Sequence, residues 1–140
     1  MNKAKLRTLL ISSATTLKES MQKLNDTAEQ ILFVTDEDNK LLGTVTDGDI
    51  RRGLINGFKF SDKVEKVMSI QFTSFFCDEA DKKEKAERIM LRDKIEQIPI
   101  LDNKKSVVDV ILWTDIFGEE KDLENKQFFT NPVVIMAGGK

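Results

Sequence analysis

Apolar residues in the first half of the chain recur first with helical and then with strand-like spacing. Leu17, Met21 and Leu24 lie at positions i, i+4 and i+7, which predicts an amphipathic helix capped by Thr15. A short apolar run and an alternating run follow, separated by polar turn residues and succeeded by a second helical pattern that ends at Asn56-Gly57. The predicted elements are strands at 31–34 and 41–46, a turn at 36–40 between them, and a helix at 47–54.

The second half of the chain repeats this order. Asp36 and Asp49 recur as Asp102 and Asp115, 66 residues later in both cases. Each half predicts β-α-β-β-α, an α+β unit too small to bury its own sheet face, so the two should pack as a pseudo-symmetric pair. The predicted units are 1–60 and 61–118, with a connector at 58–68. The second unit should contain a strand at 73–76, a helix at 80–92, strands at 97–101 and 107–112, and a short helix from Thr114.

Composition removes several functional classes. The chain has 22 basic and 24 acidic residues, so it lacks the basic excess expected of a nucleic-acid binder. Histidine is absent, which excludes Ser-His and Cys-His nucleophile pairs and histidine metal ligands. A single cysteine, Cys77, excludes an internal disulfide and a cysteine zinc cluster, and we expect it to be a small buried residue.

The N-terminus resembles a targeting segment only superficially. Lys3, Lys5 and Arg7 precede Leu9-Leu10-Ile11, an apolar run far shorter than the seven or more residues that a signal peptide needs. No stretch approaches the roughly 20 apolar residues that span a bilayer. We therefore expect a cytoplasmic protein without membrane or nucleic-acid partners.

The segment Gly43-Thr44-Val45-Thr46-Asp47-Gly48-Asp49-Ile50-Arg51-Arg52 stands where a predicted strand meets a helix. A carboxylate at Asp49 can accept two hydrogen bonds from a ribose diol, and Thr46 offers a hydroxyl at the strand end. Exposed N–H groups at the helix start favour a phosphate, to which Arg51 or Arg52 would add donors. Gly43 and Gly48 would keep side chains away from the ligand.

Local chemistry alone leaves a second interpretation open for the same segment. Strand-turn-helix caps are common, and Thr46 and Asp47 are both good capping residues. On this interpretation the two arginines are solvated and no ligand is bound. Asp47 and Asp49 are poor candidates for a direct two-carboxylate Mg²⁺ site, because alternate positions at a helix start diverge.

The two repeats resemble a tandem CBS-domain pair, the Bateman module, over about residues 8–118. Gly43-Thr44-Val45-Thr46-Asp47-Gly48-Asp49 is similar to the ribose-phosphate motif of that family. The resemblance implies clefts that bind adenosyl ligands (AMP, ADP, ATP or S-adenosylmethionine), control of an attached enzyme or channel, and association into flat dimers. The binding residues that it implies are Gly43, Thr46, Asp47, Asp49, Arg52 and Asp115.

The second repeat departs from the motif. It keeps Asp115, but it has Asp109 in place of the glycine and Leu112 in place of the hydroxyl residue. Asp115 is then a candidate helix cap and Trp113 a packing residue. We therefore expect one competent nucleotide site, centred on the first repeat.

Residues 119–131 form a charged stretch that predicts a solvated linker. The apolar residues that follow run into Ala137-Gly138-Gly139-Lys140, which resembles the opening loop of a sugar-phosphate nucleotidyltransferase. We interpret residues 132–140 as the start of such a domain, whose Mg²⁺-dependent reaction would join an NTP to a sugar 1-phosphate. The alternative is a simple terminal strand.

These observations support two functional hypotheses. The first is a regulatory module that binds an adenine nucleotide and modulates an appended nucleotidyltransferase; residues 1–140 themselves would hold no catalytic residue. The second is a ligand-free scaffold that dimerises the enzyme through Phe58, Phe60, Phe72 and Phe75. A self-contained enzyme using Asp47 and Asp49 is disfavoured, because the chain lacks both histidine and a complete phosphate loop.

Overall fold

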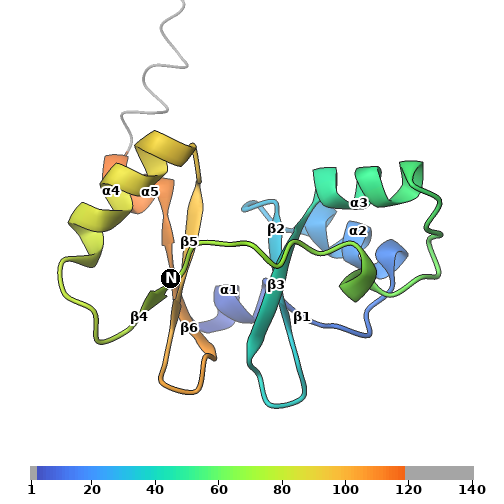
Figure 1. The fold of residues 1–140 in the computed structure, drawn as a ribbon, viewed down its shortest axis with the longest axis horizontal. Coiled ribbons are helices and arrows are strands. Elements are labelled where there is room, and N and C mark those ends of the chain that lie inside the picture. Colours follow the sequence, from blue (N-terminus) through green and yellow to red (C-terminus); the bar gives the residue numbers. More distant parts are fainter. Residues whose placement is uncertain (1–2, 119–140) are drawn as a thin grey trace, which may run out of the picture. The chain divides into compact units, whose positions relative to one another are not determined.

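The computed structural model describes residues 3–118 of the chain, and the predicted linker at 119–131 and domain start at 132–140 lie outside the described residues. Two three-stranded sheets with accompanying helices confirm the predicted α+β class (Figure 1). Contacts divide the described residues into two compact units, one of residues 3–80 with 99–110 and one of residues 81–98 with 111–118. The packing of the two sequence repeats on each other stays a prediction.

The first sheet has the strand order β1-β2-β3, with β1 parallel to β2 and β2 antiparallel to β3. Strands β2 and β3 confirm the two predicted strands. The β-α-β-β-α order also requires a strand before the first helix, and β1 is that strand, but its position was not predicted because its three residues are too few to show an alternating pattern. Ile31 at the start of β2 lies opposite Thr46 at the end of β3. The strands are β1 (Leu10–Ser12), β2 (Ile31–Thr35) and β3 (Leu41–Thr46).

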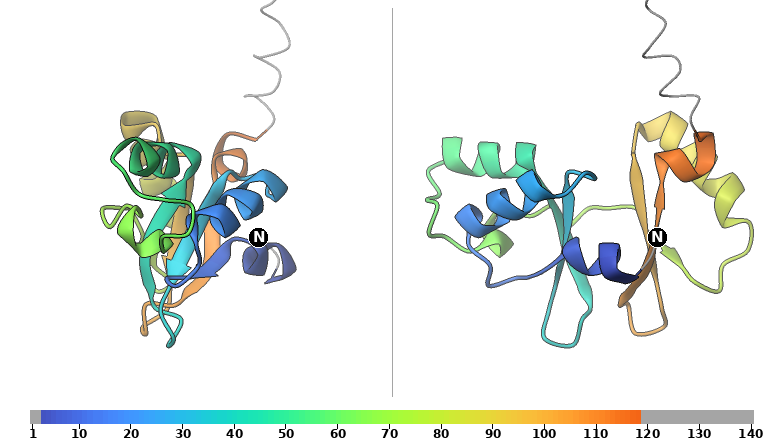
Figure 2. Two further views of the ribbon diagram at one scale, coloured as in Figure 1. Left: turned by 90° about the vertical axis from the view of Figure 1, so that its right-hand side faces the viewer. Right: turned by 180° about the vertical axis from the view of Figure 1, so that it is seen from behind.

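Two helices, α2 (Leu17–Asp26) and α3 (Asp47–Ile55), lie on the same face of this sheet (Figures 1 and 2). Helix α2 presents the predicted apolar face to the core, with Leu17 and Leu24 buried. The predicted cap was wrong by one residue. Thr16 is the N-cap because its hydroxyl accepts from the Glu19 N–H at 3.2 Å, while the Thr15 N–H donates to the Ser12 carbonyl.

A short helix α1 (Lys3–Thr8) precedes β1 and was also not predicted. It presents one buried residue, Leu6, which is too little for a periodic signal. The core between the first sheet and its helices is aliphatic and continuous. Its buried residues are Ile11, Leu17, Leu24, Leu32, Val34, Val45, Ile50 and Val64.

The segment between α3 and β4, which extends the predicted connector and takes its name from here on, contains a 3₁₀ turn, η1 (Val64–Lys66), where a helical turn was expected. Val64 is fully buried, and its N–H donates to the Thr15 carbonyl at 2.7 Å. Further along, Ser69 pairs with Thr44 of β3 through two backbone hydrogen bonds of 2.9 and 2.8 Å. The connector is thus fastened to the edge strand of the first sheet.

The second sheet has the order β4-β5-β6, and its bounds agree closely with the sequence pattern. The predicted strands at 97–101 and 107–112 are confirmed, whereas β4 covers only two of the four residues expected. The helix expected at 80–92 begins two residues later, because Asp81 is left-handed at φ 56°. The elements are β4 (Phe75–Phe76), α4 (Lys82–Asp93), β5 (Gln97–Leu101), β6 (Val107–Leu112) and α5 (Trp113–Phe117).

The 66-residue repeat is visible in the two hairpin turns. Asp36 Oδ1 accepts from the N–H groups of Asp38 and Lys40, and Asp102 Oδ1 accepts from those of Lys104 and Ser106, all at 2.8–2.9 Å. The second residue before the return strand is left-handed in both turns, with φ 66° at Asn39 and 67° at Lys105. The recurring aspartates therefore have the same structural role in both repeats.

Two other expectations concern the burial of Cys77 and the presence of a membrane-spanning helix. Cys77 was expected to be buried, but it is exposed, because it follows the two-residue strand β4 and its side chain is not covered. Residues 3–118 contain no helix long and apolar enough to cross a membrane. A cytoplasmic location stays a prediction.

Candidate functional site

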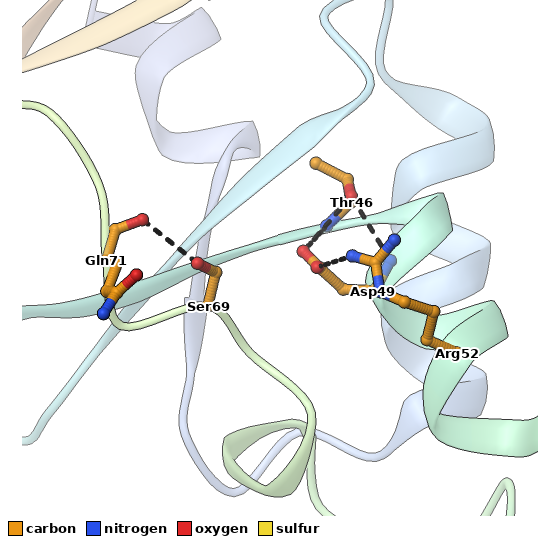
Figure 3. A network of polar contacts seen from close by, with 5 residues as sticks. All are labelled: Thr46, Asp49, Arg52, Ser69 and Gln71. Atoms are coloured by element: carbon orange, nitrogen blue, oxygen red, sulfur yellow. Dashed lines mark hydrogen bonds and ion pairs between the residues drawn. The ribbon is translucent and has the colours of Figure 1, made fainter. Parts of the chain in front are cut away.

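The candidate site is the start of α3, where Thr46 and Asp49 bind each other reciprocally (Figure 3). Thr46 is the N-cap in extended backbone geometry, and its Oγ1 accepts from the Asp49 N–H at 3.4 Å. Asp49 Oδ2 accepts in return from the Thr46 N–H at 2.9 Å and from the Thr46 hydroxyl at 3.1 Å. This capping box satisfies two N–H groups at the helix start and fixes the orientation of the carboxylate.

Arg52 completes this cluster one turn into the helix. Its Nη2 donates to Asp49 Oδ1 at 2.5 Å, so both carboxylate oxygens of Asp49 have a partner (Figure 3). The exposed fractions of the two side chains differ strongly, 70% for Arg52 and 12% for Asp49. The carboxylate is therefore held in place, while the guanidinium stands largely in solvent.

Asp47 and Arg51 form a separate pair on another side of the helix. Arg51 Nη2 donates to Asp47 Oδ2 at 2.7 Å, and both side chains are more than half exposed. The structure thus brings Thr46, Asp49 and Arg52 together as one cluster and leaves Asp47 outside it. The divergence of Asp47 from Asp49 was expected, because the two occupy alternate positions in the first turn of the helix.

Gly43 lies three residues before the N-cap, on β3, and the connector occupies the space in front of it. A Cβ at Gly43 would lie 2.6 Å from the carbonyl oxygen of Ser69 and 3.0 Å from the Met68 sulfur. The approach of Met68 and Ser69 to this position was not predicted, although a glycine inside a strand is a known sign of close backbone approach. At Gly48 an added Cβ would meet nothing closer than 3.5 Å, the nearest atom being Arg52 Nη1.

The second repeat builds only part of the same arrangement. Asp115 Oδ2 accepts from the Leu112 N–H at 2.8 Å, but Leu112 has no side-chain oxygen with which to complete the box. Asp115 is exposed, and α5 is a helix of five residues. Trp113 packs against Phe117 with ring centroids 4.2 Å apart, as expected for a packing residue.

The chemistry available at the α3 start is binding rather than bond-making. A carboxylate has about four acceptor positions, of which Asp49 uses three within the chain, so acceptor capacity is left on Oδ1. Among the residues that the structure describes, no group of three acidic or cysteine side chains is placed to hold a metal ion.

Comparison with known proteins relates the first repeat to a named family. Residues 7–56, which run from the end of α1 to the residue after α3, match the model of the CBS domain family. The chain is 25% identical over 114 residues to an inosine-5'-monophosphate dehydrogenase of Methanocaldococcus jannaschii, covering 81% of this chain and 22% of that protein. It is 27% identical over 109 residues to the arabinose 5-phosphate isomerase GutQ of Salmonella typhi, covering 74% and 32% respectively.

Solved structures extend the likeness to both sheets. A CBS domain protein from Pyrobaculum aerophilum, complexed with AMP, aligns with a TM-score of 0.63 at 18% identity, over 84% of this chain and 88% of the other. The described chain therefore has the fold of a CBS domain pair, and its first repeat also carries the CBS sequence pattern. The chain spans less than a third of the length of the two curated relatives above.

Proposed function

We propose that this chain is a regulatory module that binds an adenine nucleotide at the start of α3. The observation that carries the proposal is the Asp49 carboxylate, which Thr46 and Arg52 hold in one orientation before any ligand arrives. In the proposed complex Asp49 Oδ1 accepts from the ribose hydroxyls. Arg52, whose side chain is 70% exposed, leaves the carboxylate to pair with a phosphate.

A preorganised carboxylate favours binding because little conformational entropy is lost when the ligand docks. Nucleotide pockets elsewhere use an acidic residue in the same way to bind a ribose diol. The AMP complex of the Pyrobaculum aerophilum protein, which shares the fold, favours an adenine nucleotide as the ligand class. The proposal places Gly43 and Asp47 beside the ligand, with Thr46 and Asp49 in contact with it.

We propose one such site rather than two. Asp115 has neither a threonine partner nor an arginine at the position of Arg52, and its carboxylate is exposed. A ribose at that position would meet a carboxylate that a single backbone N–H group orients. Asp115 is therefore the natural control residue for every test of Asp49.

The test compares ligand-induced thermal stabilisation in matched variants. AMP, ATP, GTP and S-adenosylmethionine are each added to the wild type, to Asp49→Asn and to Asp115→Asn. A ligand present at 100 times its Kd should stabilise the wild type by about 2.7 kcal/mol. Asp49→Asn should lose this increment relative to its own ligand-free baseline, while Asp115→Asn keeps it. No shift in the wild type with any ligand at millimolar concentration would overturn the proposal.

The identity of the regulated enzyme is a separate proposal. We propose a sugar-phosphate nucleotidyltransferase, on the Ala137-Gly138-Gly139-Lys140 sequence alone, with Mg²⁺ serving only in the catalytic domain. The two relatives described above are a dehydrogenase and an isomerase, which offer this assignment no support. The coding sequence after Lys140 tests it: Gly-Thr-Arg-Leu close behind would favour a nucleotidyltransferase, and a different continuation would remove the assignment.

A ligand-free dimerisation scaffold is the second candidate function. Of the four aromatic residues expected at its interface, Phe75 is buried, Phe58 packs against the core and Phe72 is half-buried, so Phe60, exposed at 51%, is the most accessible. Ile55, at the end of α3, is 77% exposed and supplies further apolar surface. Sedimentation of the wild type and of Phe60→Ser with Ile55→Ser tests this role. A monomeric wild type, with or without AMP, would exclude it.

A further inference from the structure

A hollow of about 420 Å³ lies on the first compact unit, between the C-terminal ends of helices α1 and α2. Helix α1 supplies one wall through its last two residues, and α2 supplies the other through its last turn and its C-cap residue. We call it the charged hollow, and its lining residues are Arg7, Thr8, Lys23, Asp26 and Thr27. It shares no residue with the nucleotide site proposed above.

Three charged side chains line this hollow without partners of their own. Arg7, Lys23 and Asp26 are exposed, and none of their side chains makes a hydrogen bond or an ion pair within residues 3–118. Lys23 and Asp26 are three positions apart on α2, a spacing that allows an ion pair, yet they do not bind each other. Opposite charges that stay apart around one hollow are both available to a ligand that carries both signs.

Asp26 occupies a position where a carboxylate is unfavourable. It is the last residue of α2, and the C-terminus of a helix carries partial negative charge, which favours a cation there. No side-chain partner within residues 3–118 offsets this cost. A cation supplied by a ligand would be attracted both by the Asp26 carboxylate and by the end of the helix. Asp26 therefore indicates a ligand with a positively charged group.

The two threonine hydroxyls complement both signs of charge. The Thr8 hydroxyl donates to the Lys5 carbonyl at 2.6 Å, so its oxygen can still accept from an ammonium group. The Thr27 hydroxyl oxygen accepts from the Glu29 N–H at 3.4 Å, so its proton is available to a carboxylate. An ion pair of 2.6 Å between Lys5 and Glu29 joins α1 to the segment after α2. Because this pair fixes the two walls, little rearrangement is needed when a ligand binds.

We propose that the charged hollow binds a free acidic amino acid, of the aspartate or glutamate type. In this complex Asp26 accepts from the ligand's ammonium group, while Arg7 and Lys23 each donate to one of its two carboxylates. Two cations and one anion give the lining a net charge of +1, which the net negative charge of the ligand neutralises. A phosphorylated sugar would satisfy the two cations but would bring no cation to Asp26. The volume falls within the roughly 300–1,000 Å³ that is usual for small-molecule sites.

The experiment follows the Arg7 side-chain Nε–H and the Thr8 and Thr27 backbone amides by NMR while ligands are added to the chain. L-aspartate and L-glutamate are compared with succinate and glutarate, which lack the ammonium group, and with L-asparagine and L-glutamine, which lack the second carboxylate. Glucose 1-phosphate represents a simple anion. At least one acidic amino acid should shift these resonances at millimolar concentration, and every comparator should bind at least tenfold more weakly. No shift with either acidic amino acid, or an equal affinity for any comparator, would overturn the proposal.

Matched variants separate a specific site from a general effect of charge. Asp26→Asn removes the proposed ammonium partner at almost constant size, and the fold should be kept because a carboxylate at a helix C-terminus is not stabilising. This variant should bind the amino acid at least tenfold more weakly and should no longer distinguish it from the dicarboxylate. Asp38→Asn, which neutralises an exposed carboxylate of the first hairpin turn, is the control and should bind as the wild type does. Equal affinities in the two variants would overturn the proposal.

The same titrations keep this site distinct from the nucleotide site. Asp49→Asn should bind the acidic amino acid as the wild type does, because Asp49 does not line the charged hollow. A wild type that binds the amino acid but not AMP would support the charged hollow and overturn only the nucleotide site. A wild type that binds AMP but neither acidic amino acid would do the reverse.

Discussion

Asp49 and Asp115 each accept a hydrogen bond from the backbone N–H three residues earlier, at 2.9 and 2.8 Å. Only Asp49 also accepts from a hydroxyl group and from an arginine. The two positions are equivalent by the 66-residue repeat, so the difference arises from the residues around them. The second repeat has Leu112 where the first has Thr46, so Asp115 has one hydrogen-bond partner and an exposed side chain.

Loss of the Thr46 hydroxyl should destabilise the first unit. Thr46→Ala removes the acceptor for the Asp49 N–H and a donor to the Asp49 carboxylate, and we expect a cost of about 1 kcal/mol in the free energy of unfolding. Urea denaturation measures this cost. Thr114→Ala, at an exposed position in the first turn of α5, serves as the control and should be nearly neutral. Equal losses in the two variants would show that the capping box contributes nothing.

Arg52 should matter more for a phosphorylated ligand than for stability. The Arg52 side chain is 70% exposed although it pairs with Asp49, so Arg52→Ala should change the free energy of unfolding by less than about 1 kcal/mol. The affinity for AMP should fall about tenfold, since hydrogen bonds to charged groups contribute roughly 1.5–3 kcal/mol. Calorimetric titration with AMP measures this affinity. Arg51→Ala, which removes the partner of Asp47, should bind AMP as the wild type does, and a parallel loss would argue against a specific role for Arg52.

Alanine should be rejected at Gly43 and accepted at Gly48. At Gly43 the new methyl group would collide with the Ser69 carbonyl oxygen, which is backbone and cannot turn aside, so we expect a loss of about 1–3 kcal/mol. At Gly48 the nearest atom is the end of the flexible Arg52 side chain, and alanine in the helix should gain up to about 1 kcal/mol. Thermal unfolding of the two variants should therefore give opposite signs. The same sign for both would contradict the close approach of the connector to β3.

Glu19 should make stability depend on pH in the acid range. The pKa of Glu19 is lowered because its carboxylate accepts from the Thr16 N–H and, secondarily, from the Thr16 hydroxyl. A lowered folded-state pKa means that the stabilisation is complete above the unfolded value of about 4.3 and is lost as pH falls through the folded-state value. Glu19→Gln should therefore have a lower Tm than the wild type at neutral pH, and the difference should shrink as the pH is lowered below the unfolded value of about 4.3. A difference that does not vary with pH would mean that the charge of Glu19 is irrelevant.

Much of the architecture could be predicted from the sequence, because its elements show strong periodicity or clear turn chemistry. The strands 41–46, 97–101 and 107–112 were placed at their observed bounds, since each is an apolar run flanked by polar turn residues. Helix α1 could not be predicted and strand β1 could not be located, because six and three residues do not establish a period. Their positions depend on contacts with residues distant in sequence, such as Leu10 opposite Phe33.

The geometry at the start of α3 could be predicted only in part. The sequence indicated Thr46 as a capping residue and the divergence of Asp47 from Asp49, but it did not indicate the capping box that joins Thr46 to Asp49. The choice of Arg52 rather than Arg51 as the partner of Asp49 depends on side-chain geometry. The approach of Ser69 to Gly43 and the gathering of Arg7, Lys23 and Asp26 around one hollow require the tertiary fold, since each joins separate elements.

The backbone pairing of Thr44 with Ser69 ties the helix start to the connector. Thr44 and Thr46 belong to the same strand, two residues apart, and a strand in a sheet resists stretching. A ligand that pulled Thr46 along the strand axis would have to carry Ser69 with it or break two hydrogen bonds. A displacement of Thr46 on ligand binding would therefore be transmitted to Ser69, some twenty residues later in the sequence, without the unfolding of any helix.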